Sequence, residues 1–311
     1  METKLIKHQW NSNLKSQPSL GFFGILKESF KTANRNRKLL FPLLILAFLS
    51  FSLLNFAEIY LLEPVAEDFS LQLTNNPKMV QDIRDDDTNI MAIYSNAIND
   101  ISVVTLSIFI LNWQINLVFL IAIVSSSSKA YTAKLLDPKE TISNIRKSYE
   151  NVRDTSFRLV FITLGLITLG FFSKGIVFIL AAGSSALYLF NVILSFSIAA
   201  LFFYVSALWM MTMVVSVLED VGGLDAIVTA KQVIIKGKRV QASLIMALAA
   251  VVYVLVRMTK DALPIYNLDK WSRLAVTIPC SNGMICILKL FIFVVFTVFY
   301  HEQKESSVKE S

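Results

Sequence analysis

Blocks of consecutive apolar residues, separated by short polar and basic stretches, dominate the chain of 311 residues. A helix that rises about 1.5 Å per residue needs about 20 apolar residues to cross the roughly 30 Å hydrocarbon layer of a bilayer. The blocks that approach or exceed this length lie at 39–62, 101–124, 159–181, 187–217, 240–258 and 284–300. None of them alternates with a period of two as a barrel strand does. Because backbone groups in lipid must be paired, each block is predicted to be a transmembrane helix.

The division between the third and fourth blocks is the least marked part of this pattern. The apolar tract from Leu159 to Leu218 is too long for a single crossing. Its best turn residues are Gly183-Ser184-Ser185, so the chain is expected to reverse there. The predicted fold class is therefore all-α, a polytopic membrane helical bundle with six transmembrane helices.

Basic residues flank these blocks unevenly, and the asymmetry predicts the orientation of the chain. With a cytosolic N-terminus, 21 of the 29 Lys and Arg residues fall in cytosolic segments. Those segments are 1–38, 125–158, 219–239 and the tail after residue 302. The 63–100 loop on the other side carries only Lys78 and Arg84 against eight acidic residues, whereas the 259–283 loop, with three basic residues, fits less well. Both termini are expected in the cytosol, and anionic lipid explains the net charge of +6 better than nucleic acid does.

The three long cytosolic segments share a second property, because apolar residues recur in them at helical spacing with basic residues off that face. The first stripe consists of Phe22, Ile25, Leu26, Phe30 and Ala33. The second consists of Ile142, Ile145, Tyr149 and Val152, and the third of Leu224, Ile227, Val228, Ile234 and Ile235. Each segment is predicted to be a cytosolic amphipathic interfacial helix, which makes the chain three copies of amphipathic helix, span, span. The alternative is that three helices on one membrane surface share this character without being a repeat.

Composition supports one membrane domain rather than soluble domains. Charged residues make up 17% of the chain and hydrophobic residues 55%, whereas a soluble domain carries about 25% charged residues. A single six-span domain is expected over 21–302, between a disordered cytosolic tail at 1–20 and a cytosolic tail at 303–311. The first 38 residues lack the apolar core of a signal peptide, so the first span is expected to act as the targeting signal.

Local motifs carry a family resemblance. They are GFFGILKESFK from Gly21, NRNRKLL from Asn34, VVSVLEDVGGLDAI from Val214 and IKGK from Ile235. Together they resemble a plant family of uncharacterised six-span membrane proteins, over about residues 20–302. A more distant likeness is to the membrane domain fused to some bacterial glycerophosphodiester phosphodiesterases. The resemblance implies six helices in the endoplasmic reticulum, elsewhere in the endomembrane system or in the plasma membrane, and it implies no established activity.

Polar residues inside the predicted spans are the first candidates for function. Asn112 and Asn116 lie four apart in the second block and so share a helix face, with Gln114 on another face. Such amides either bond neighbouring helices, which we favour, or line a polar path. Lys174 lies well inside the third block, and Glu58, near the outer end of the first, is a conceivable partner. These five residues form the candidate intramembrane polar site.

Two further groups fall on the predicted outer side. The acidic run Asp82, Asp85, Asp86 and Asp87 lacks the ligand alternation and glycine of a calcium loop, so a solvated turn is favoured over a cation site. Cys280 and Cys286 lie at or near the outer face, where oxidation is permitted. A disulfide between them is one interpretation, and the other is that Cys286 already lies inside the sixth span.

Catalytic signatures are not found in this sequence. It contains no HExxH, GxSxG, P-loop or GxGxxG motif, and its two histidines, His8 and His301, fall in the opposite tails. We therefore expect no enzyme activity, no cofactor and no metal. The favoured function is a non-enzymatic membrane scaffold or trafficking factor, with anionic lipid and protein partners at the amphipathic helices. The alternative is a transporter or channel for a small or lipid-like solute.

Overall fold

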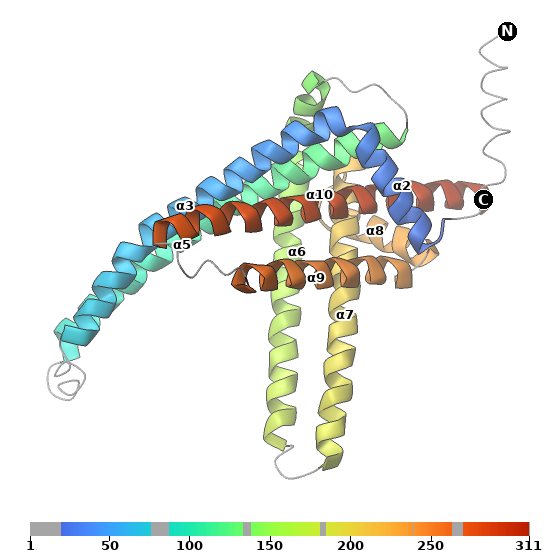
Figure 1. Ribbon diagram of the computed structural model, residues 1–311. Coiled ribbons are helices and arrows are strands. Elements are labelled where there is room, and N and C mark those ends of the chain that lie inside the picture. The colour runs from blue at the N-terminus through green and yellow to red at the C-terminus, as the bar shows by residue number, and fades with distance from the viewer. Residues whose placement is uncertain are drawn as a thin grey trace, which may run out of the picture. The chain divides into compact units, whose positions relative to one another are not determined.

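The computed structural model describes residues 20–75, 87–132, 138–180, 185–237, 239–262 and 270–310. Within these ranges the chain forms helices and no strand, which confirms the all-α prediction. The helices are α2 (Phe22–Arg35), α3 (Arg37–Asn75), α5 (Asp87–Tyr131), α6 (Pro138–Leu180), α7 (Ser185–Leu218), α8 (Gly223–Gly237), α9 (Arg239–Ala262) and α10 (Lys270–Glu310) (Figure 1).

Six of the described helices are long and apolar enough to cross a membrane. Their candidate spans are Arg37–Leu62, Ile101–Tyr131, Thr141–Ser173, Leu189–Leu218, Arg239–Met258 and Pro279–Ser306. Each overlaps one of the apolar blocks of the sequence. The expected break between the third and fourth spans falls between the end of α6 at Leu180 and the start of α7 at Ser185.

The chain divides into two compact units. The first unit comprises Met1–Leu40, Ile121–Val252 and Lys289–Ser311, and the second comprises Phe41–Leu120 and Tyr253–Leu288. The sequence had suggested one domain over 21–302. Four helices, α3, α5, α9 and α10, pass from one unit to the other along the chain.

The second amphipathic segment is not a separate helix, contrary to expectation. It is the beginning of α6, which runs without a break from Pro138 to Leu180. Between Pro138 and Gly165 the sequence offers no glycine or proline to end a helix. An ion pair between Arg158 Nε and Asp154 Oδ2, 3.0 Å apart, spans the expected joint one helical turn apart. The first and third segments do form separate helices, α2 and α8, of 14 and 15 residues.

The core of the first unit is built from long, fully buried side chains. It includes Ile25, Ile121, Val152, Met211, Ile234, Phe296 and Phe299. Figure 1 shows α6 and α7 running side by side, and α8 contacts both of them. The turn between α7 and α8 therefore lies against α6, and this contact positions the site described next.

The second unit has a smaller core. Phe51 of α3 and Phe119 of α5 are buried, with ring centroids 6.5 Å apart in an edge-on arrangement. Ala47, Leu117 and Leu120 are buried as well. Most other side chains described on α3 in this unit are partly or fully exposed.

Candidate functional site

The turn between α7 and α8, residues 219–223, has an unusual backbone. Asp220 has φ of 56° and Gly223 has φ of 63°, the left-handed region that most residues avoid. Gly223 enters this region at no steric cost, and aspartate is among the few other residues that tolerate it. The sequence EDVGG thus encodes a tight reversal that starts α8 immediately after α7 ends.

Polar side chains from α6 hold Asp220 in this conformation. Asn151 Nδ2 donates to the backbone oxygen and to Oδ1 of Asp220, both at 3.1 Å. Lys147 Nζ lies 2.8 Å from the other carboxylate oxygen. Charge-assisted hydrogen bonds of this kind are stronger than neutral ones. The strained end of the turn is therefore fixed to one face of α6.

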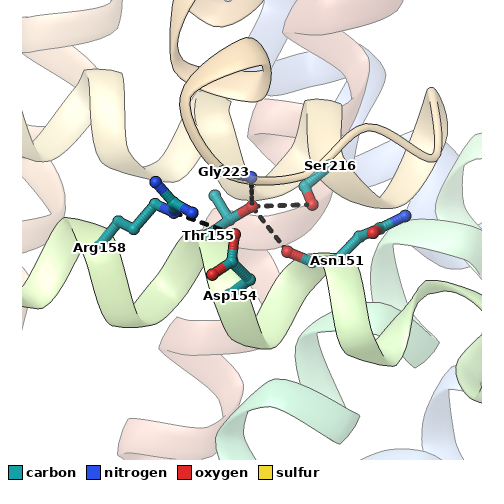
Figure 2. A network of polar contacts seen from close by, with 6 residues as sticks. All are labelled: Asn151, Asp154, Thr155, Arg158, Ser216 and Gly223. Atoms are coloured by element: carbon teal, nitrogen blue, oxygen red, sulfur yellow. Dashed lines mark hydrogen bonds and ion pairs between the residues drawn. The ribbon is translucent and has the colours of Figure 1, made fainter.

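A buried hydroxyl of α6 holds the other end of the turn. The Gly223 N–H donates to Thr155 Oγ1 at 2.8 Å, and Thr155 Oγ1 donates to the Asn151 carbonyl at 2.7 Å (Figure 2). Ser216 Oγ of α7 lies 3.4 Å from the same hydroxyl. Thr155 and Ser216 are fully buried. The threonine thus satisfies a backbone donor that burial would otherwise leave unpaired.

Close approach of the backbones explains the two glycines of the turn. A Cβ on Gly223 would lie 2.9 Å from Asp154 Oδ2 and 3.1 Å from Arg158 Nε. A Cβ on Gly222 would lie 3.1 Å from Asn151 Oδ1 and 3.3 Å from Asn151 Cα. A side chain at either position would therefore have to displace atoms of α6, and at Gly223 it would also be strained by the positive φ. We call the set Lys147, Asn151, Thr155, Ser216, Asp220 and Gly223 the polar junction.

A second group of contacts joins the end of α7 to α10 in the same unit. Glu219 accepts hydrogen bonds from the Tyr300 hydroxyl and from Lys304 Nζ, the latter at 3.0 Å. Lys304 Nζ also donates to the Tyr300 oxygen at 2.9 Å. Burial raises the pKa of Glu219, but the bonds from Tyr300 and Lys304, with the charge of Lys304, bring it below its ordinary value. The carboxylate is therefore held in its ionised form.

His301 is found in a place that the sequence did not suggest. It lies in α10, within a candidate span, rather than in a tail. Its Nε2 is 2.9 Å from Ser128 Oγ near the end of α5, and its ring stacks on Tyr131 with centroids 5.1 Å apart. A serine bonded to a histidine is the nucleophile and base part of hydrolytic triads. In the part of the chain that the structure describes, no carboxylate bonds the other ring nitrogen, and the contact joins α5 to α10.

Two of the three predicted amides of α5, Asn112 and Asn116, are bonded to each other. Asn116 Nδ2 donates to the Asn112 backbone oxygen at 2.8 Å and to Asn112 Oδ1 at 3.1 Å. Asn112 is exposed, whereas Gln114, Asn116 and Glu58 are partly exposed. The shared face of Asn112 and Asn116 is thus present, with part of its hydrogen bonding met within one helix.

The other predicted residues fall into two groups. The side chain of Lys174 lies outside the described residues, as do Asp82, Asp85, Asp86 and the side chain of Asp87. Cys280 is exposed and Cys286 is buried, and no disulfide joins them. Six residues apart on α10, they are separated by about 9 Å along the helix axis, beyond the reach of a disulfide.

An amide contact between two candidate spans was missed at the level of sequence. In the second unit Asn55 Nδ2 of α3 donates to Asn282 Oδ1 of α10 at 2.9 Å, and Asn282 Nδ2 lies 3.4 Å from Ser52 Oγ. Ser52 and Asn282 are buried. Asn55 lies in the first apolar block, and its polar side chain inside a predicted span was a signal of this contact. Contacts of this type join helices in lipid.

The polar junction of the first unit connects α6 to α7 and to the start of α8. Each polar side chain of the polar junction bonds the α7–α8 turn or another side chain of the set. Within the described residues no cluster of three or more His, Cys, Asp or Glu could hold a metal ion. The bonds of the polar junction hold α8 against α6 and α7.

Comparison with known proteins places the chain in a family. No curated protein and no solved structure matches it. The model of one family, a domain of unknown function (DUF8558), matches residues 12–307. Since this match covers nearly the whole chain, the protein belongs to the DUF8558 family.

Proposed function

We propose that this protein is an integral membrane scaffold or trafficking factor without enzyme activity, whose working surface is the cytosolic face of the membrane. The proposal has six crossings, with both termini in the cytosol of an endomembrane compartment or of the plasma membrane. The likeness to the six-span plant family agrees with it. The proposal rests on one observation. In each of three segments, some apolar residues are buried in the protein and others are exposed.

In α2 the stripe is split into an inner and an outer edge. Ile25, Ser29 and Thr32 are buried in the first unit. Phe23 and Phe30 point outward, and Phe23 is 80% exposed. These two rings lie on one side of the helix, next to the face that carries the exposed Lys27 and Lys31. Large aromatic side chains beside lysines are typical of helices that lie in a membrane interface.

The same division recurs in α8. Its inner face consists of small residues and one large one, namely Gly223, Ala226, Ala230 and Ile234, all buried. Its outer edge presents Leu224 and Val228, with Leu224 59% exposed, beside the exposed Lys231. The small inner residues let α8 approach α6 and α7 closely. The larger apolar residues Leu224 and Val228 face away from the unit, where they can contact the membrane.

The start of α6 follows this pattern too. Ser148, Val152 and Thr155 are buried, while Ile142 is 68% exposed near the exposed Arg146 and Lys147. The stripe expected from the sequence, Ile142 to Val152, is therefore not buried along its whole length. Only Val152 of that stripe is fully buried, and Ile142 belongs to the outer edge.

A common function follows from the three segments. Exposed apolar residues next to cations match a surface that is apolar below and anionic above, as the cytosolic leaflet is. Anchored there, the segments offer their basic faces to cytosolic proteins. We also propose that the protein has no enzyme activity, because the polar side chains of the polar junction already bond the α7–α8 turn or each other.

The test is the depth of single positions in a bilayer. Phe23→Cys and Leu224→Cys, each in a Cys280→Ala/Cys286→Ala background, carry an environment-sensitive fluorophore in reconstituted vesicles. Lipids with a quencher near the glycerol level are expected to quench both, because these positions face the interface. The matched controls Glu28→Cys and Asp225→Cys, on the polar sides of the same helices, are expected to respond to aqueous iodide instead. Equal iodide quenching of all four positions would rule out the interfacial placement.

Transport of a small or lipid-like solute is the second candidate, favoured by the exposed Asn112 on the face that it shares with Asn116. It predicts that Asn112→Leu with Lys174→Leu reduces solute flux into reconstituted vesicles. Equal flux in the variant and the parent protein would remove these residues from a transport path. The intrahelical bond between the amides favours the scaffold, because it lowers the cost of an amide in lipid.

A further inference from the structure

The corner between α2 and α3 concentrates positive charge on a fixed backbone. Arg35, Arg37 and Lys38 surround the turn residue Asn36, and all three cations are exposed. Within the described residues, none of the three makes an ion pair or a hydrogen bond through its side chain. The nearest carboxylate in sequence, Glu28, is paired with Lys31 at 3.2 Å. The corner therefore carries three uncompensated charges.

Asn36 makes this corner rigid. Its N–H donates to the Thr32 carbonyl at 3.2 Å, and its own carbonyl accepts from the N–H groups of Leu39 and Leu40, both at 3.0 Å. Its side chain Nδ2 donates to the Ser126 carbonyl of α5 at 3.1 Å. Both helices at the corner are thus tied to the core of the first unit. The cations are attached to a backbone that needs no ordering when a ligand binds.

An exposed aromatic side chain lies on α2 one turn before the charges. Phe30 is exposed, yet its ring meets that of Phe291 of α10 with centroids 4.4 Å apart. The ring is therefore held in place while one side of it stays open. An open ring and exposed cations thus lie within one short stretch of sequence, which suits a ligand with an apolar part and an anionic head.

We propose that the α2–α3 corner binds the phosphomonoester headgroup of an anionic phospholipid. A phosphomonoester carries about −1.5 to −2 charges at neutral pH, which matches three cations better than a headgroup with one net charge. The planar guanidinium groups of Arg35 and Arg37 are suited to two-point contact with phosphate oxygens, and Lys38 adds a point charge. This inference rests on the proposed cytosolic interface and names the lipid class that the interface selects.

The experiment measures lipid binding to the full-length protein in a neutral detergent by native mass spectrometry. The probes are phosphatidic acid, phosphatidylserine and inorganic phosphate. Phosphatidic acid is expected to bind more tightly than phosphatidylserine. Arg35→Gln/Arg37→Gln/Lys38→Gln is expected to weaken phosphatidic acid binding by about tenfold or more, since each cation near an anionic lipid contributes roughly a fivefold gain in affinity.

A matched variant separates the corner from general charge. Arg153→Gln/Arg239→Gln/Arg257→Gln removes the same number of exposed cations elsewhere and is expected to keep the preference for phosphatidic acid. Equal losses in the two triple variants, or no preference over phosphatidylserine, would overturn the assignment. Displacement of phosphatidic acid by inorganic phosphate at similar concentration would assign the corner to a soluble phosphate and overturn the lipid proposal.

Failure of this inference can be told apart from failure of the proposed function. The depth of the fluorophore at Phe23→Cys and Leu224→Cys depends on the interfacial placement and not on the lipid headgroup. If the positions lie at the interface and the preference for phosphatidic acid is missing, only the headgroup assignment fails. If the fluorophores at positions 23 and 224 are exposed to water, the scaffold proposal fails. The lipid-binding proposal for the α2–α3 corner, which rests on it, then fails as well.

Discussion

The two halves of the α6–α7 hairpin belong to the same pair of helices and are built in opposite ways. In the half next to α8, residues 211–217 of α7 are all buried, and α6 buries Thr155, Ser156 and Leu159 against them. In the other half, none of the side chains described over 160–173 and 189–206 is buried. The helices still approach each other there, as the Cβ position on Gly170, 3.8 Å from Ile198 Cγ2, indicates.

This contrast separates two ways of stabilising a helix. The half next to α8 depends on specific packing and on hydrogen bonds such as that from Gly223 to Thr155. The other half pairs its backbone internally, and its apolar side chains would face lipid under the proposed function. Substitutions should therefore be costly in the first half and tolerated in the second. The following predictions test this difference from the largest effect to the smallest.

Gly223→Ala should have the largest effect. Its φ of 63° is strained for alanine, and the added Cβ would lie 2.9 Å from Asp154 Oδ2. We expect a loss of roughly 2–3 kcal/mol in unfolding free energy, measured by denaturant titration of the purified protein. Gly165→Ala is the control in the other half, because nothing lies within 4 Å of its Cβ position. Similar losses in both variants would contradict the contrast between the halves.

Thr155→Val should come next. The substitution keeps the shape of the side chain and removes the hydroxyl that accepts the Gly223 N–H. Leaving a buried donor unpaired costs about 1–3 kcal/mol, which the same titration would detect. Thr168→Val is the matched control, since this exposed hydroxyl bonds only the Leu164 carbonyl of its own helix at 2.9 Å. A Thr155→Val protein as stable as the control variant would show that the bond contributes nothing.

Glu219→Gln should have the smallest effect, and the effect should depend on pH. Because the folded pKa of Glu219 lies below its ordinary value of 4.5, its ionised form stabilises the fold. That contribution is complete above the ordinary pKa and is lost as the pH falls through the lowered one. We expect a difference of well under 1 kcal/mol at neutral pH, as for other partly exposed pairs.

The measurement for Glu219 is the melting temperature of the parent protein and of the Glu219→Gln variant from neutral to acidic pH. The difference between them should shrink as the solution becomes acidic. A difference that does not change with pH would mean that the charge of Glu219 does not stabilise the end of α7.

The helical content of the chain and the approximate location of its apolar helices could be predicted from the sequence. Each of the six apolar blocks overlaps a helix that meets the length and hydropathy of a span. The break near Gly183 was also expected, and α6 and α7 end and begin on either side of it. These features are local, because the number of consecutive apolar residues decides whether a helix can cross a bilayer.

Contacts between distant residues could not be predicted in this way. Thr155 and Gly223 are separated by 68 positions, and Ser128 and His301 by 173. A threonine in a helix and a histidine near a terminus carry no local sign of such partners. The candidate amides show the same limit, since Asn112 and Asn116 bond each other while Asn55 and Asn282 join two helices.

The sequence by itself determined which segments are helices and which of them are apolar enough for a bilayer. Its helical periodicity also located the three basic amphipathic segments. Only the tertiary structure decided how each stripe is divided, with Ile25 and Ile234 turned inward and Phe30 and Leu224 outward. The physical reason is that periodicity defines one apolar face, whereas the size and position of the neighbouring helices select the residues of that face that pack. Small residues such as Gly223 and Ala226 allow that packing, whereas Phe30 and Leu224 stay exposed, on the surface that the proposed function assigns to contact with the membrane.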